Sequence, residues 1–231
     1  MFGNCRHLQG TRAARAAALV FALGWLATSQ ASTVDFRLLP ALKSDLAIES
    51  LLLDIARDGN RLLVGGEQGN ILYSDDNGQS WMQADVPVSL AITSVTFARP
   101  GEAWATAHDG YLLHSGDNGA TWEVKLSGSD VAKLSVVTLE AQIEVLRSAV
   151  DNATPETLED AEWALDDGLF ALDEATAAID EGMTAPLLDV WFADENSGYA
   201  LGAYGVFLRT NDGGETWVAD SNRLDNPDKY H

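Results

Sequence analysis

Three copies of one eight-residue pattern constrain what this chain can fold into. The pattern is Ser/Thr-x-Asp-x-Gly-x-Ser/Thr-Trp, and its copies begin at Ser74, Ser115 and Thr210. An internal repeat of this kind indicates a repetitive architecture. We expect a motif used three times to serve folding and not catalysis. The defining residues are Ser74, Asp76, Gly78, Ser80 and Trp81; Ser115, Asp117, Gly119, Thr121 and Trp122; and Thr210, Asp212, Gly214, Thr216 and Trp217.

Each position of the pattern suits a tight turn. The Asp carboxylate can accept hydrogen bonds from nearby backbone N–H groups. The Gly can adopt a positive φ at no steric cost, and the hydroxyls offer further local bonds. The Trp supplies a large apolar surface at the start of the next strand. The pattern therefore predicts the hairpin turn between two antiparallel strands.

The flanking residues repeat as well. A glycine stands five residues before each copy, at Gly69, Gly110 and Gly205, and short apolar runs lie on either side of it. Each unit is predicted to form four short strands in about 40–45 residues, which is the size of one β-propeller blade. The predicted fold is mainly β: a partial β-propeller of about three four-stranded blades. The expected strands are 51–55, 62–64 and 71–73; 92–97, 103–105 and 111–113; and 187–192, 199–201 and 206–208, each set completed by a strand that begins at the Trp.

The three copies are identified as the Asp box, or bacterial neuraminidase repeat. The wider units resemble the photosystem II stability/assembly factor-like family of propellers, through residues 52–56, 64–69 and 198–205. This resemblance covers about residues 46 to 220, apart from one insertion. It implies a non-catalytic propeller that binds or assembles other proteins. The photosynthetic members carry a basic patch, whereas this chain has no cluster of arginines. Candidate binding residues on the turns away from the boxes are Glu67, Gln68, His108, Asp109 and Tyr204.

The insertion, at about residues 127–185, breaks the blade pattern. Its apolar residues recur at steps of four and three, which predicts an antiparallel hairpin of two helices. Residues 152–155 separate the two runs. Thr154 is the expected N-cap of the second helix, with Pro155 at its first position, and Gly182 is its expected end.

The charge of the insertion is strongly negative. It holds 14 acidic residues against Lys133 and Arg147, a net charge of −12. Two interpretations stay open: a solvated helical face, and a docking arm for a basic partner that is separate from the core of the blades. The candidate docking residues are Glu159, Asp160, Asp166, Asp167, Asp173 and Glu174.

The N-terminus predicts a cleaved signal peptide, residues 1–31. Three arginines precede an apolar stretch that is too short to span a membrane, and a Ser-Gln-Ala site follows it. Cleavage after Ala31 would leave Ser32 as the first residue of an exported, periplasmic protein. The only cysteine, Cys5, lies in this segment. The formal net charge of −21 becomes −24 when the three arginines are removed, which disfavours nucleic acid or anionic lipid as a partner.

Three blades are fewer than the four or so that a closed propeller needs. We expect residues 32–231 to be a truncated propeller or a fragment; two chains forming one ring and a stable open arc are the alternatives.

The sequence favours a protein scaffold over an enzyme. No arginine falls in a recognisable sialidase motif, and no metal site, phosphate-binding loop or other cofactor site is expected. The predicted function is assembly through a protein partner, for example a membrane transporter or assembly complex with a basic surface. The alternative is a sialidase-like, glycan-binding propeller.

Overall fold

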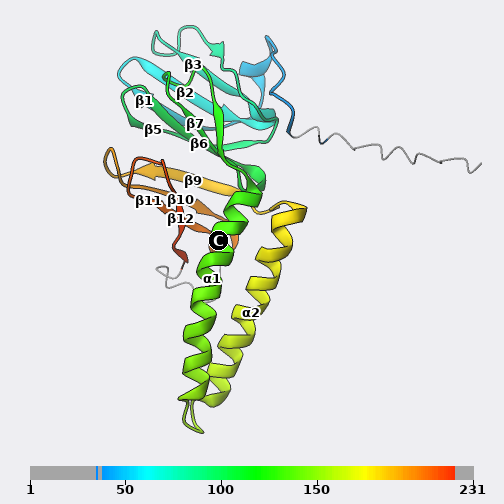
Figure 1. The fold of residues 1–231 in the computed structure, drawn as a ribbon. Helices are drawn as coiled ribbons and strands as arrows, with labels where there is room; N and C mark the ends of the chain where they lie inside the picture. Colours follow the sequence, from blue (N-terminus) through cyan, green and yellow to red (C-terminus); the bar gives the residue numbers. More distant parts are fainter. Residues whose placement is uncertain (1–34, 36–37, 222–231) are drawn as a thin grey trace, which may run out of the picture. The chain divides into compact units, whose positions relative to one another are not determined.

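A computed structural model describes residue 35 and residues 38–221 (Figure 1). The expected signal peptide and its cleavage site lie outside these residues. Within the described part, neither long helix is long and apolar enough to cross a membrane.

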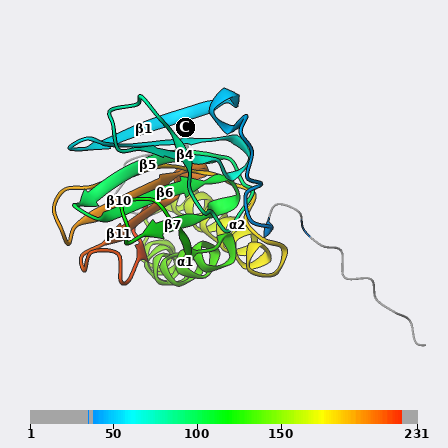
Figure 2. The ribbon, with the colours of Figure 1, turned by 90° about the horizontal axis from the view of Figure 1, so that it is seen from above.

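Three four-stranded antiparallel sheets follow one another along the chain, each with its strands in chain order. In Figures 1 and 2 the second sheet lies between the other two, and β1 contacts β5 as β5 contacts β9. The first sheet comprises β1 (Leu52–Asp58), β2 (Arg61–Gly66), β3 (Ile71–Ser74) and β4 (Met82–Gln83). The second comprises β5 (Ile92–Arg99), β6 (Glu102–Ala107), β7 (Leu112–Ser115) and β8 (Glu123–Leu126). The third comprises β9 (Leu187–Phe192), β10 (Gly198–Gly202), β11 (Phe207–Thr210) and β12 (Val218–Ala219). The mainly β prediction, with four strands per repeat, is therefore confirmed, although each fourth strand begins one residue after the Trp.

The strand register aligns the three sheets residue by residue. In each sheet the residue before the repeat pattern pairs with one residue of the second strand: Leu63 with Tyr73, Trp104 with His114, and Tyr199 with Arg209. Leu63, Trp104 and Tyr199 are thus equivalent positions. By the same register, Ile55, Val95 and Val190 are equivalent on the first strands.

Two hydrophobic cores hold the sheets together. The first lies between the first and second sheets and includes Leu63, Val95 and Trp122; the second lies between the second and third and includes Trp104 and Val190. The repeat glycines allow this close packing. A Cβ at Gly119 would lie 2.4 Å from a methyl carbon of Leu63, and a Cβ at Gly214 would lie 2.2 Å from the Trp104 ring.

Two helices form an antiparallel hairpin between β8 and β9, as the apolar spacing predicted (Figure 1). Helix α1 (Gly128–Asp151) begins with a capping box, in which Ser127 and Asp130 bond reciprocally. Helix α2 (Leu158–Glu181) ends at Gly182, as expected, and this glycine adopts φ +85°. The predicted N-cap at Thr154 is wrong: residues 154–157 form a separate turn, closed by the Thr157 N–H on the Thr154 carbonyl, so that the helix begins three residues later.

The root of the hairpin belongs to the second core, which corrects the expectation of an arm separate from the blades. Val131 is fully buried and clusters with Trp104 and Leu187. The Thr138 hydroxyl also donates to the Ala219 carbonyl of β12 at 2.8 Å. The sequence period could identify the helix, but it could not show which of its turns is buried against a sheet.

Candidate partner-binding surfaces

The repeat turns bind their own carboxylates tightly. In the first copy the Ser74 hydroxyl donates to Asp76 at 2.7 Å, and the N–H and hydroxyl of Ser80 donate to the same carboxylate at 2.8 and 2.6 Å. The Gly78 N–H donates to the Ser74 hydroxyl at 2.8 Å. The other two copies repeat this set of bonds. The three carboxylates are therefore engaged by local donors.

These bonds favour the charged form of each carboxyl group. Hydrogen bonds from the hydroxyl and N–H of Ser80 lower the pKa of Asp76 from 3.8 to about 2, and those from Thr216 do the same for Asp212. For Asp117, burial is the largest influence and raises the pKa, but the bonds from Thr121 and Ser115 together outweigh it, so the pKa is lowered.

The turns at the other end of the sheets hold the first group of candidate binding residues. Gln68, Asp109 and Tyr204 occupy equivalent positions with φ between +57° and +59°, and a left-handed glycine follows each. Such a backbone is uncommon for a residue other than glycine. The Glu67 carboxylate accepts the Leu51 N–H at 3.0 Å, so it closes a local contact.

One of these turns touches the root of the helical hairpin. A Cβ at Gly128, the first residue of α1, would lie 2.3 Å from the Asp109 carbonyl oxygen. The structure thus places Asp109 beside the helices. His108 and Tyr204 are exposed, and Tyr204 exposes 64% of its surface.

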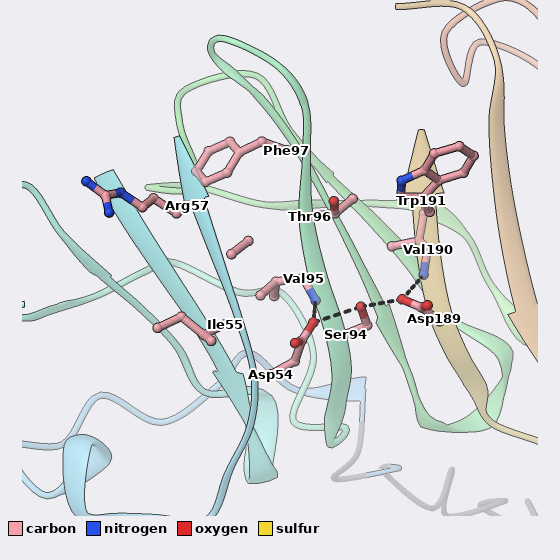
Figure 3. Close-up of a pocket in the computed structure, with 11 residues that line it drawn as sticks. Asp54, Ile55, Arg57, Ser94, Val95, Thr96, Phe97, Asp189, Val190 and Trp191 are labelled. Atoms are coloured by element: carbon pink, nitrogen blue, oxygen red, sulfur yellow. Dashed lines mark hydrogen bonds between the residues drawn. The ribbon is translucent and has the colours of Figure 1, made fainter. Parts of the chain in front are cut away.

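A groove of about 340 Å³ crosses the first strands of the three sheets, β1, β5 and β9. Ser94 lies between two carboxylates: its hydroxyl oxygen is 2.9 Å from Asp54 and 2.8 Å from Asp189 (Figure 3). Since a hydroxyl has one proton, it donates to one of them at a time. Arg57, Phe97 and Trp191 lie toward the other end of the groove in Figure 3.

This groove was not predicted from the sequence. Asp54 and Asp189 each lie within a short apolar run, Leu-Leu-Asp-Ile and Leu-Leu-Asp-Val, and Ser94 lies between Thr93 and Val95. The three polar residues occupy equivalent positions of the strand register. A polar residue repeated inside a buried strand is a signal that it has a specific partner.

The helical hairpin exposes both charge and aromatic surface. The six candidate acids of α2, from Glu159 to Glu174, are all exposed. Between them along the same side of the helix lie Trp163 and Phe170, seven residues apart, with 68% and 61% of their surface exposed. We call this side of α2 the acidic–aromatic face. Its acids were predicted as candidate docking residues, but Trp163 and Phe170 were not, because these two residues lie outside the apolar period that the helices bury.

A metal site is not evident in this part of the chain: among the described residues, no three or more His, Cys, Asp or Glu side chains gather where they could hold an ion.

Comparison with known proteins confirms the resemblance that the sequence predicted. No family model matches the chain. Over 84 residues the chain is 32% identical to the photosystem II assembly lipoprotein Ycf48 of Nostoc sp. (strain PCC 7120), a match that covers 35% of this chain and 24% of that protein. The structure is also similar to YCF48 bound to D1 peptide (TM-score 0.45) and to YCF48 from Cyanidioschyzon merolae (TM-score 0.44), each 16% identical. These matches cover 74% and 73% of this chain, and 40% of each of those chains. The chain is thus similar to photosystem II assembly factors, and the matches span well under half of their length.

Proposed function

We propose that this chain is a non-catalytic β-propeller scaffold that binds another protein and promotes the assembly of a larger complex. The similarity to an assembly lipoprotein supports this role. In this proposal the three sheets are propeller blades, and the repeat turns are Asp boxes that stabilise them. The observation that carries the proposal is the acidic–aromatic face of α2, an exposed surface on a helical hairpin whose first turn is buried in the second core.

The chemistry of this face selects a basic partner. Helix α2 contains nine acidic residues and no lysine, arginine or histidine. The two bases of the hairpin pair on α1 instead, Lys133 with Asp130 at 3.0 Å and Arg147 with Glu144 at 2.8 Å. The charge of α2 is therefore not neutralised from within its own helix.

Trp163 and Phe170 add affinity that charge alone does not supply. An exposed ion pair between a carboxylate and a basic side chain contributes little to the free energy of binding, about 0–1 kcal/mol, whereas aromatic residues are typical anchors of protein interfaces. An arginine or lysine of the partner can also lie over the Trp163 ring. The ligand that fits this face is an amphipathic segment whose basic residues alternate with apolar ones over two helical turns.

A defined peptide pair tests the proposal. We expect the full chain to bind a helical peptide of alternating Lys/Arg and Leu residues, as measured by isothermal titration calorimetry, and not its Glu-for-Lys counterpart. Binding should weaken as the NaCl concentration is raised, because salt screens the attraction between exposed charges, whose range is about 8 Å at physiological ionic strength. Replacing both Trp163 and Phe170 by Ala should weaken binding about tenfold or more.

Val145→Ala is the matched control, because Val145 is equally exposed (69%) but lies on α1. Its affinity should equal that of the wild type. Equal binding of both peptides, or unchanged binding in the Trp163/Phe170 double variant, would show that the acidic–aromatic face of α2 is a solvated surface and not a binding site.

The groove supports a second candidate function, glycan binding. Trp191 and Phe97 offer ring surfaces at one end of the groove, and Asp54 and Asp189 offer carboxylates at the other end, an arrangement suited to stacking on a sugar chain and to bonding its hydroxyls. Binding on a glycan array that is lost in Trp191→Ala, while peptide binding persists, would favour this second function.

We also propose that the protein is exported. The proposal depends on the arginines, the apolar stretch and the Ser-Gln-Ala site of residues 1–31. N-terminal sequencing of protein from the periplasm should begin at Ser32; an intact Met1 in a cytosolic protein would contradict it.

A further inference from the structure

Each sheet has two faces that we name by chain direction. The forward face of the first sheet packs on the second, and the forward face of the second packs on the third; the opposite faces are the backward faces. Leu63 of the first forward face lies over Gly119 of the second sheet, and Trp104 of the second lies over Gly214 of the third. Leu63 and Trp104 are equivalent by register, as are the two glycines of the repeat pattern. The chain thus makes the same contact twice.

The forward face of the third sheet carries the next member of this series among exposed apolar side chains. Tyr199 is equivalent to Leu63 and Trp104. Its ring stacks between Trp191, at 6.1 Å, and Phe207, at 5.7 Å, and Trp191 exposes 56% of its surface. Leu201 beside them exposes 40%. This is an aromatic surface built like the two forward faces that are buried.

The backward face of the first sheet is the matching receiver. Gly78 is equivalent to Gly119 and Gly214, but a Cβ there would meet only Trp81 and Leu62 of its own sheet. Ile55 is equivalent to Val95 and Val190, which expose 3% and 2%, yet Ile55 exposes 60%. Gly78 is thus partly exposed and Ile55 exposed, whereas Val64 and Leu72 on the same face are buried, at 5% and 3%.

We propose that two copies of this chain associate head to tail, with the forward face of each third sheet on the backward face of the first sheet of the other copy. Tyr199 of one copy then lies over Gly78 of the other, which repeats the contact of Leu63 with Gly119 and of Trp104 with Gly214. The contact is heterologous, and it closes when two such contacts form between the same two chains. Two chains of three sheets give a ring of six, within the range of about four to eight blades that propellers adopt. This inference depends on the sheet packing and not on the ligand of α2.

The inner edge of the ring gives a second, independent test of the placement. Within the chain, Asp54 of the first sheet accepts the Ser94 hydroxyl and the Val95 N–H of the second. Across the proposed contact Asp189 faces Asp54 of the other copy, so two carboxylates meet where a carboxylate faces the Ser94 hydroxyl within the chain. Asp189→Ser supplies a hydroxyl donor at each of the two contacts and should tighten the association by about tenfold per contact, as one added hydrogen bond to a charged group would do.

Sedimentation equilibrium of the full chain tests the proposal. The wild type should have twice the mass of one chain at micromolar concentration, and its association should tighten as salt is raised, because each chain is strongly acidic and Asp189 faces Asp54 across the contact. Trp191→Glu alters only the forward face and Ile55→Glu only the backward face; each should raise the dissociation constant at least tenfold. An equimolar mixture of the two variants should recover association, because one contact then joins two unaltered faces. Phe170→Glu, on the equally exposed hairpin, should leave the dimer unchanged, and circular dichroism should confirm that every variant is folded.

The possible results of this experiment distinguish between a second copy of the chain and other molecules as the partner of these two faces. A wild-type monomer at high concentration would show that another protein or another sheet covers them. A continuous series of larger species would show that the contact does not close at two copies. A mixture of the two variants that stays monomeric, or an Asp189→Ser variant that does not tighten the dimer, would overturn the head-to-tail placement.

Discussion

Ser94 Oγ lies 2.9 Å from the carboxylate of Asp54 and so ties the second sheet to the first. The Val95 N–H donates to the same carboxylate oxygen at 2.9 Å. Both donors come from β5 and the acceptor from β1, so the bond joins sheets and does not belong to either ladder. Ser94 is buried, with 5% of its surface exposed.

We expect Ser94→Ala to lower the free energy of unfolding by about 1–2 kcal/mol, because it leaves two partly buried carboxylates with one donor fewer. Urea denaturation measures the change. Thr96→Ala, two residues along the same strand and lining the same groove, is the control and should change stability by less than about 0.5 kcal/mol. Equal stability of the two variants would show that Ser94 does not hold the sheets together.

Gly214→Ala tests the packing between the second and third sheets. A Cβ there would lie 2.2 Å from the Trp104 ring, and Gly214 also has φ +88°. Gly101 has φ +90° with nothing within 4 Å of the added carbon. Gly101→Ala should therefore cost only the backbone strain, about 1–2 kcal/mol, whereas Gly214→Ala should cost about 2 kcal/mol more through overpacking. Thermal unfolding of both variants measures the difference, and equal losses would contradict the close contact.

Much of the β architecture could be predicted because it is local and repeated. The turn residues of each copy and the apolar runs around them specify a hairpin, and repetition at a fixed spacing sets four strands per unit. The left-handed residue before each repeat glycine, Asn77, Asn118 or Gly213, was not predicted, although Asn and Gly are the residues that accept this conformation most readily.

The contacts that the sequence analysis missed depend on tertiary structure. Ser94 meets Asp54 and Asp189 across about 40 and 95 positions of the chain, so no local pattern links them. Val131 and Val137 both lie outside the apolar series of α1, which runs 132, 136, 139, 143, 146 and 150, yet Val131 is fully buried against two sheets while Val137 is 68% exposed. Periodicity identifies the apolar side of a helix but not the length over which another element covers it.

Tyr204 is held in a backbone conformation that opposes its own side chain. Its φ of +59° brings Cβ close to the following carbonyl oxygen, which costs an L-residue roughly 1–2 kcal/mol. We expect Tyr204→Gly to be more stable than Tyr204→Ala by about 1 kcal/mol in chemical denaturation. At an ordinary φ the order is reversed, with Ala ahead of Gly by about 0.5–1 kcal/mol. The comparison of Gly with Ala removes the ring in both variants, so it isolates the backbone; the ordinary order would contradict the left-handed turn.

Asp117→Ala tests whether a repeat carboxylate serves folding. It removes the acceptor of bonds from the Thr121 N–H, the Thr121 hydroxyl and the Ser115 hydroxyl. The turn is largely exposed, so the free energy of unfolding should fall by only about 1–2 kcal/mol. Peptide binding by α2 should be unchanged in the folded variant. Wild-type stability together with lost binding would assign Asp117 to a binding site instead.

Acid should weaken the repeat turns in a defined pH range. Hydrogen bonds from Ser80 and Thr216 lower the pKa values of Asp76 and Asp212 to about 2, below the ordinary value of 3.8. A carboxyl group with a lowered pKa in the folded protein stabilises the fold fully above its unfolded pKa. This contribution is lost as the pH falls from about 4 to about 2, because protonation removes the charge that accepts the bonds.

The double variant Asp76→Asn/Asp212→Asn should therefore have a lower melting temperature than the wild type above pH 4, and the difference should shrink toward pH 2. Differential scanning calorimetry across this range measures both melting temperatures. Gln79→Ala, in the same turn as Asp76 but without a titratable group, is the control and should melt in parallel with the wild type. A difference between the double variant and the wild type that stays constant from pH 5 to pH 2 would show that these carboxylates stabilise the turns independently of their charge.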